Sequence, residues 1–141
     1  MLSALSAAAA DFLVVGAHAL AVHGYPRATG DFDIWVRPTR ENADRVWDAI
    51  EKYGAPRRGI TRDDFLTPDT VFQIGVAPNR IDILTSIDGV DFADAWEKRA
   101  PAVVDKQSFF VIGRDDLLKN KRAAGRPKDL ADAAWLEEAD Q

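Results

Sequence analysis

The stretch from residue 14 to residue 36 sets the strongest limit on how this chain can fold. Residues 12–15 form a short apolar run that ends at Gly16, which is typical of a buried strand meeting a helix. Residues 17–23 are long enough for about two helical turns before Gly24 ends them. The segment DFDIWV then predicts a second strand, which begins with two closely spaced carboxylates.

Asp31 and Asp33 are two residues apart, so on a strand their side chains point to one face. Their Cβ atoms would lie roughly 6.5–7 Å apart. Two carboxylates at this spacing suit hard divalent cations, of which Mg²⁺ is the first expectation and Mn²⁺ the second. Gly16 lies at a helix start, where backbone N–H groups can receive a phosphate. A phosphate seat beside a metal-holding pair predicts nucleotide chemistry.

The Gly16-Ala17 pair followed by Asp31-Phe32-Asp33 resembles the signature of the nucleotidyltransferase superfamily of the DNA polymerase β type. The chain more closely resembles small bacterial nucleotidyltransferases grouped with AbiEii-like toxins and minimal nucleotidyltransferases. The segments that carry this resemblance, and that together cover most of the chain, are HGYPRATGDFDIWV, NRIDILTSIDGVDFADAW and DLLKNKRAAGRPKDLADAAWLE. The resemblance implies an α+β nucleotidyltransferase fold with a mixed, mostly antiparallel sheet flanked by helices. Ala17 stands where the family has Gly or Ser, so a hydroxyl contact is absent while the backbone N–H groups remain.

A third carboxylate is expected from a hairpin. Residues 71–76 and 80–85 flank Ala-Pro-Asn and predict two antiparallel strands. On the second of them Asp82 lies between two isoleucines, where burying a carboxylate without a partner is costly. A metal shared with Asp31 and Asp33 would supply that partner, and the resemblance implies this role for Asp82, with help in activating an acceptor hydroxyl. The alternative is a surface Asp on an edge strand.

Five basic residues lie close together near the C-terminus, with no acidic residue among them: Lys119, Lys121, Arg122, Arg126 and Lys128. The segment resembles the C-terminal Lys…Lys-Asp-x-x-Asp pattern of AbiEii-like proteins. That resemblance implies that Lys121 stabilises leaving pyrophosphate and that Lys128 helps to bind the triphosphate, while Arg126 and Asp129 are structural partners. The alternative is a solvated helix face.

Arg27 and Thr29 lie in the loop that enters the carboxylate strand, where they suit either a phosphate contact or an ordinary turn. His18 is expected to be structural, because it is five residues from His23 and the two are poorly spaced as joint helical metal ligands. In the polar segment 55–69, Phe65 and Leu66 are expected to pin the chain to the body of the protein. The segment either contacts an acceptor substrate or forms a solvated loop with paired charges.

The remaining elements follow from local signals. Further helices are predicted over residues 2–10, 40–53, 91–99, 115–124 and 127–139, and further strands over 103–104 and 108–112. Thr39 is the expected N-cap of the helix over 40–53, and Gly54 its end. In the last helix Leu130, Ala133, Ala134 and Leu136 are expected to form the apolar face.

Composition excludes several classes of protein. A length of 141 residues predicts a single domain, 1–141, with a C-terminal helical segment from about residue 114. The chain has no cysteine, so it has no disulfide and no thiolate site. A net charge of −5 argues against broad coating of nucleic acid. The apolar stretch 2–22 lacks a preceding positive residue and contains Asp11, so we expect a cytoplasmic protein with no membrane segment.

The sequence therefore predicts a Mg²⁺-dependent nucleotidyltransferase that moves a nucleoside monophosphate from a nucleoside triphosphate to an acceptor hydroxyl. An RNA end, a protein hydroxyl and a small molecule all remain open as the acceptor, and a toxin–antitoxin system is one setting. Two alternatives also stay open: a non-catalytic, antitoxin-like partner with this fold, and a Mg²⁺-dependent phosphohydrolase.

Overall fold

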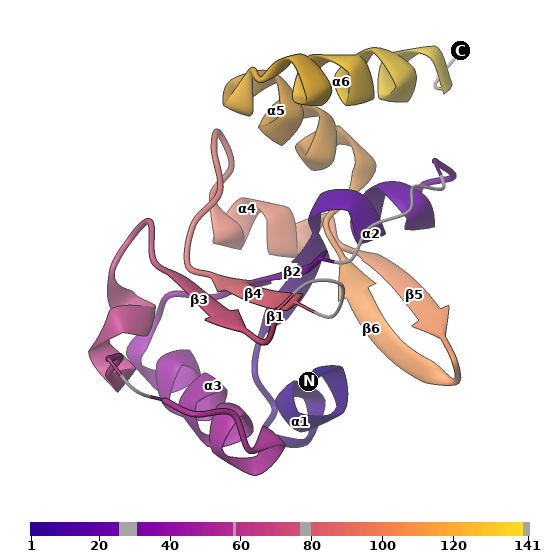
Figure 1. The fold of residues 1–141 in the computed structure, drawn as a ribbon. Helices are drawn as coiled ribbons and strands as arrows, with labels where there is room; N and C mark the ends of the chain where they lie inside the picture. The colour runs from indigo at the N-terminus through magenta and orange to yellow at the C-terminus, as the bar shows by residue number, and fades with distance from the viewer. Residues whose placement is uncertain (26–30, 58, 77–79, 140–141) are drawn as a thin grey trace.

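The computed structural model describes residues 1–25, 31–57, 59–76 and 80–139 (Figure 1). Its strands are β1 (Phe12–Val15), β2 (Asp31–Val36), β3 (Val71–Ile74), β4 (Arg80–Leu84), β5 (Ala100–Val104) and β6 (Gln107–Val111). Its helices are α1 (Leu2–Ala7), α2 (Gly16–Val22), α3 (Arg40–Tyr53), the 3₁₀ helix η1 (Arg62–Leu66), α4 (Phe92–Glu97), α5 (Arg114–Ala124) and α6 (Pro127–Ala139). The predicted elements are thus present, with ends that shift by a few residues.

The strands form one open sheet in the order β3-β4-β2-β1-β6-β5. The two hairpins, β3–β4 and β5–β6, are antiparallel, as is β1–β2, whereas β2–β4 and β1–β6 are parallel. The predicted α+β fold with a mixed, mostly antiparallel sheet and flanking helices is confirmed. The parallel β2–β4 pair requires a long crossover, which α3 and η1 supply.

Alternation along β2 divides its side chains between two faces of the sheet. Ile34 is paired with Ile83 of β4, and Ile83 is paired with Phe72 of β3, so these three side chains share one face. Phe72 packs edge-to-face on Phe65 of η1, with 6.3 Å between ring centroids. This face is therefore the one covered by η1 and α3 (Figure 1). Trp35 points the other way and packs edge-to-face on Phe92 of α4, with 5.0 Å between ring centroids. Asp31 and Asp33 alternate with the same period and therefore also lie on the α4 side.

Residues 59–69 contain a helix that the sequence did not predict. This helix is η1, and its Phe65 is fully buried, so the predicted anchoring is confirmed. Its charges pair with α3, with 3.3 Å between Arg40 and Asp63 and 3.4 Å between Arg62 and Asp44. Because η1 lies on the sheet face opposite the two carboxylates, the structure favours the solvated loop with paired charges over a contact with an acceptor.

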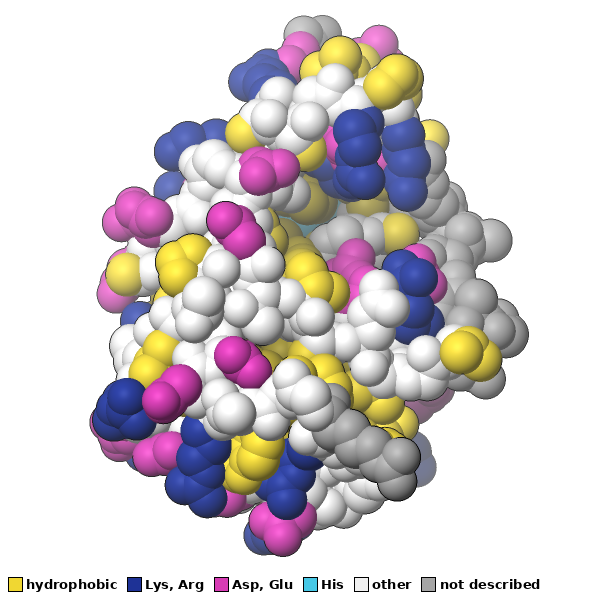
Figure 2. Space-filling model, turned by 60° about the vertical axis from the view of Figure 1, so that its left-hand side comes forward, with side chains coloured by type: hydrophobic (Ala, Val, Ile, Leu, Met, Phe, Trp, Pro, Cys, Tyr) yellow, Lys and Arg dark blue, Asp and Glu magenta, His cyan; other side chains and the backbone are white. Residues whose placement is uncertain are grey.

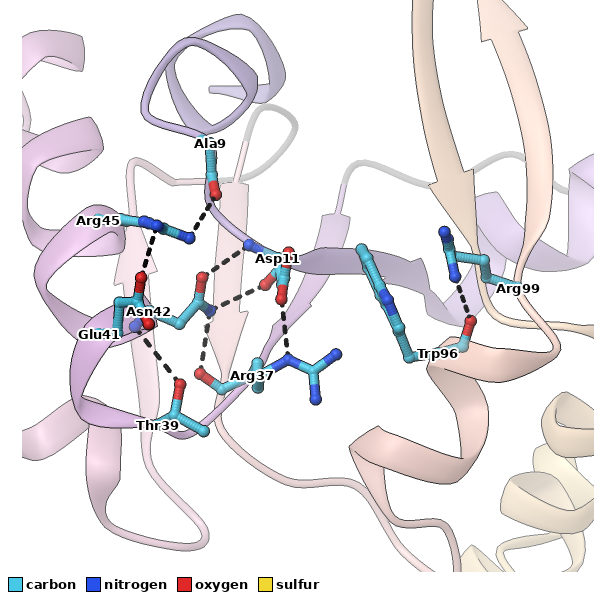
Figure 3. Close-up of polar contacts among 9 residues, drawn as sticks. All are labelled: Ala9, Asp11, Arg37, Thr39, Glu41, Asn42, Arg45, Trp96 and Arg99. Carbon is cyan, nitrogen blue, oxygen red and sulfur yellow. Dashed lines mark hydrogen bonds and ion pairs between the residues drawn. The ribbon is translucent and has the colours of Figure 1, made fainter.

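A buried asparagine ties the start of β1 to the end of β2 (Figure 3). Asn42 is 2% exposed, and its Nδ2 donates to the carbonyl oxygens of Asp11 and Arg37, each at 3.0 Å. Its Oδ1 accepts from the Asp11 N–H at 2.7 Å, and Arg37 Nε donates to the Asp11 carboxylate at 2.9 Å. Because β1 and β2 are antiparallel, this junction supports the register that places Val15 opposite Asp33.

Helix ends follow the predicted signals. Thr39 Oγ1 accepts from the backbone N–H at the third position of α3, and Gly54 ends α3 in the left-handed conformation. The predicted apolar face of α6 is half wrong: Ala133 and Leu136 are buried, whereas Ala134 is exposed and Leu130 is 50% exposed. Asp129 and Asp132 are buried instead. Among the described residues, no helix combines the length and the apolar character needed to cross a membrane.

Candidate active site

Two parallel strands bring four charged side chains to one face of the sheet. In the β2–β4 register Asp31 lies beside Arg80, and Asp33 beside Asp82. Side chains at paired positions share a face, so all four point toward the α4 side. Arg80 lies between two of the carboxylates, with Nη2 2.9 Å from Asp31 Oδ2 and Nε 3.2 Å from Asp82 Oδ1.

Gly16 begins α2 in direct contact with Asp33. Its φ is +70°, and a Cβ at this position would lie 2.4 Å from Asp33 Oδ2. Any side chain would therefore displace the carboxylate, in addition to straining the backbone. The glycine allows the start of α2 to approach the acidic strand closely, and the antiparallel register of β1 and β2 places it there.

A cavity of about 260 Å³ lies between this face and the C-terminal helices. The predicted site residues that line it are Gly16, Ala17, Asp31, Asp33, Lys121 and Lys128. Figure 2 shows the surface hollowed, with acidic side chains in and beside the hollow and Lys and Arg side chains along its upper side. Asp82 does not line the cavity and is 7% exposed. Arg27 and Thr29 lie outside the described residues.

The carboxylates carry more negative charge than Arg80 offsets. Burial, together with the nearby charges of Asp82 and Asp31, raises the pKa of Asp33 to about 6 from its ordinary value of 3.8. Burial also raises the pKa of Asp82, although Arg80 opposes that shift. A site of this kind favours the approach of a further cation.

The carboxylate oxygens of the site suit a hard divalent cation, but Asp82, the expected third ligand, does not line the cavity. Asp31 and Asp33 offer oxygen ligands to the cavity. Oδ1 of Asp82 is buried and makes no hydrogen bond, so it retains capacity for a ligand. Among the described residues, however, no three His, Cys, Asp or Glu side chains are arranged to hold one metal ion. Arg80 engages Asp31 and Asp82, and the metal role of Asp82 stays a prediction.

Lys121 is buried rather than solvated. It is 6% exposed, and its Nζ lies 3.4 Å from Asp129 Oδ1 and 3.2 Å from Asp132 Oδ2. The expected Arg126–Asp129 pair is present at 2.6 Å. Burial would raise the pKa of Asp129, but Arg126 and Lys121 outweigh it and lower that pKa. The solvated-face alternative is therefore wrong for Lys121 and right for Lys119, which is exposed.

The charge of Lys121 is already balanced by two aspartates, which limits what it can offer to a phosphate. The KDLAD segment places both aspartates on the inner face of α6, three residues apart, and this explains why α6 buries acids where leucine was expected. Lys121 still lines the cavity, so it contributes to the site in a paired state.

A larger cavity of about 760 Å³ lies elsewhere, among α1, α2 and the β5–β6 hairpin. Its lining is mainly apolar and includes neither Asp31 nor Asp33. His18 lies here with its ring 4.2 Å from that of Phe32, and burial lowers its pKa. A neutral, ring-packed histidine agrees with the structural role expected for it.

Sequence reasoning missed Arg80. The signal was present, because Arg80 and Asp82 are two residues apart on a strand, as Asp31 and Asp33 are. The same alternation places the arginine on the face of the carboxylates. What the sequence does not contain is the parallel register that puts Arg80 beside Asp31.

No protein-family model matches the chain, and no curated protein matches it at a significant level. Among solved structures, the chain is similar to the crystal structure of a "putative nucleotidyltransferase" from Thermotoga maritima. The TM-score is 0.63, with 97% of this chain and 88% of that chain covered, at 15% sequence identity. At this identity the likeness shows the fold, which is nucleotidyltransferase-like, and it does not address the resemblance to AbiEii-like proteins.

Proposed function

We propose that the protein is a Mg²⁺-dependent nucleotidyltransferase that transfers a nucleoside monophosphate to an acceptor hydroxyl. One observation carries the proposal: three carboxylates on adjacent strands share a face beside a cavity lined by basic side chains. Carboxylate oxygens suit a divalent cation, and basic groups suit a triphosphate. The nucleotidyltransferase-like fold is consistent with this chemistry.

Each group then has a distinct role. Asp31, Asp33 and Asp82 would hold Mg²⁺ or Mn²⁺, which when bound neutralises charge that develops on the α-phosphate and on pyrophosphate. Gly16 and Ala17, which line the cavity, would seat a phosphate with their backbone N–H groups. Lys121 and Lys128, which line the cavity, would contact the β- and γ-phosphates.

In the proposed step the acceptor hydroxyl oxygen attacks the α-phosphorus of the nucleoside triphosphate. The bond between that phosphorus and the bridging oxygen breaks, and the electron pair leaves with pyrophosphate. The hydroxyl proton passes to the carboxylate of Asp82, which shares the face of Asp31 and Asp33. The products are the nucleotidylated acceptor and pyrophosphate.

The test measures which molecules receive the labelled nucleotide, and not only how much nucleoside triphosphate is consumed. The protein is incubated with α-labelled nucleoside triphosphates, Mg²⁺ and cell lysate, and label is measured in RNA, protein and small molecules together with pyrophosphate release. We expect pyrophosphate release in proportion to label on one class of acceptor. Hydrolysis without labelled acceptor would identify a phosphohydrolase, and nucleotide binding with neither product would identify a non-catalytic partner. Asp33→Asn serves as the inactive control.

A toxin–antitoxin setting is proposed from the sequence resemblance to AbiEii-like proteins. We expect induced expression of the active protein to slow growth of a host cell, and Asp33→Asn to relieve that effect. Normal growth at equal protein levels would argue against a toxin role and leave the transfer reaction to be judged by the labelling experiment.

A further inference from the structure

Arg80 holds the position that a shared metal ion would need. Its guanidinium spans the two strands, 2.9 Å from Asp31 and 3.2 Å from Asp82. A divalent cation bound by the same two carboxylates would compete with Arg80 for them, because the cation and the guanidinium repel each other at short distance.

The contact between Arg80 and Asp82 is only partly hydrogen-bonded. Nη2 of Arg80 donates to Oδ2 of Asp82 at 3.3 Å. Nε of Arg80 and Oδ1 of Asp82 are both buried and 3.2 Å apart, yet neither of these two atoms makes a hydrogen bond. A partly hydrogen-bonded ion pair is weaker than a complete two-pronged one and is easier to replace.

The Arg80 side chain is exposed enough to move away from the carboxylates. Its side chain is 34% exposed, so the guanidinium can leave the carboxylates without crossing the core. Arginine binds phosphate through two parallel hydrogen bonds. A nucleotide beside Asp31 would therefore offer the displaced group a new partner.

We propose that Arg80 is a built-in counter-ion, which a divalent cation displaces from Asp31 and Asp82, and that the displaced guanidinium then binds a phosphate of the nucleotide. This inference rests on the proposed function. It implies that metal alone binds weakly, because releasing Arg80 opposes it. Metal and nucleotide together bind cooperatively, because the phosphate receives the released group.

The experiment measures Mn²⁺ binding to the whole chain by electron paramagnetic resonance, and needs no turnover. Without nucleotide, we expect Arg80→Gln to bind Mn²⁺ about tenfold more tightly than the wild type, as loss of a competing cation implies. A non-hydrolysable triphosphate analogue should tighten Mn²⁺ binding at least about tenfold more in the wild type than in Arg80→Gln. The affinity of the analogue itself for Mn²⁺ is measured separately and subtracted.

The matched control is Arg45→Gln. Arg45 also pairs with a carboxylate, Glu41 at 2.7 Å, but on α3 and away from the cavity. Its Mn²⁺ affinity should equal that of the wild type. Arg80→Lys retains a charge but not the two-pronged contact, so it should fall between the wild type and Arg80→Gln, and it decides the question if Arg80→Gln fails to fold.

The outcomes separate this inference from the proposed function. If the wild type binds Mn²⁺ and removing the Arg80 guanidinium leaves the affinity unchanged, the counter-ion role is wrong while the metal site stands. If the wild type binds no Mn²⁺ even with the analogue, both the metal site and the counter-ion role are wrong. If Arg80→Gln binds Mn²⁺ more tightly than the wild type, but the triphosphate analogue still tightens Mn²⁺ binding equally in both, then Arg80 does not move to the phosphate.

Discussion

The two ends of strand β2 carry polar clusters of opposite character. At its C-terminal end Asn42 satisfies two carbonyl oxygens and one N–H group, and Arg37 pairs with Asp11 (Figure 3). At its N-terminal end Asp31 and Asp33 share a face with Asp82, and burial and like charge raise the pKa of Asp33 to about 6. We call these the junction end and the cavity end.

The difference between the ends indicates what each contributes. Buried polar groups with complete hydrogen bonds stabilise one arrangement of the chain, which suits the junction end. Like charges held together against their repulsion cost stability and are typical of functional sites. The junction end therefore supports the register of β1 and β2, and that register holds the unfavourable cluster at the cavity end in place.

The largest expected effect is on activity at the cavity end. Asp33→Asn keeps the size of the side chain but removes the charge, so it should reduce nucleotide transfer by about a thousandfold or more. The fold should remain, because Asn fits the same space beside Gly16. Transfer is measured with labelled nucleotide, and folding by circular dichroism.

The control for this substitution is Asp105→Asn. Asp105 is exposed in the β5–β6 turn with φ of 52°, a conformation that asparagine accepts readily. It should transfer nucleotide at the wild-type rate. Wild-type activity in Asp33→Asn would show that the carboxylate pair has no part in catalysis.

The next effect, on stability, belongs to the buried cluster of Lys121 with Asp129 and Asp132, on the helices that lie across the cavity from β2. Lys121→Ala leaves Asp129 and Asp132 buried without their shared cation, which should cost about 3–5 kcal/mol of unfolding free energy. Arg126 still contacts Asp129, which favours the lower figure. Urea unfolding measures the loss, and activity per folded molecule separately measures any role toward phosphate.

Lys119→Ala provides the comparison for this change, because Lys119 is exposed on the same helix. It should alter stability by less than about 0.5 kcal/mol. If the two lysine variants unfold alike, the buried pair is not a source of stability. If Lys121→Ala loses stability but keeps its activity per folded molecule, the lysine is structural and the phosphates are held by other groups.

A smaller loss of stability is expected at the junction end. Asn42→Ala removes three hydrogen bonds to backbone groups, and should lower the unfolding free energy by about 2–3 kcal/mol. Asn120→Ala is the matched control, because Asn120 makes one described bond, to the Asp88 carbonyl at 2.9 Å. It should cost about 0.5–1 kcal/mol. Equal losses in the two variants would remove the distinction drawn for the junction.

Local chemistry predicted the elements, and non-local pairing was needed for the site. The N-cap at Thr39, the end at Gly54 and the alternation of Asp31 with Asp33 depend on neighbours in sequence, so they could be found without a structure. The engagement of Asp31 by Arg80 depends on how β2 and β4 pair, across a sequence separation of 49 positions. Asn42 gave no signal at all, because a polar residue in the first turn of a helix is ordinary.

The smallest effect is a dependence of stability on pH at the cavity end. In the unfolded chain Asp33 should titrate near 3.8, and in the folded protein its pKa is about 6, so between these values the folded state binds more protons. Stability from this group is therefore full below about pH 4 and is lost as the pH rises through about 6. Allowing for solvent screening, the loss amounts to about 1–2 kcal/mol.

The measurement compares Asp33→Asn, whose side chain cannot titrate, with the wild type in EDTA. The unfolding free energy of Asp33→Asn minus that of the wild type should rise by about 1–2 kcal/mol between pH 4 and pH 8. The same difference for Asp105→Asn should not change with pH. A constant difference between Asp33→Asn and the wild type over this range would mean that the cavity end is not held against its own charge, and the contrast with the junction end would fail.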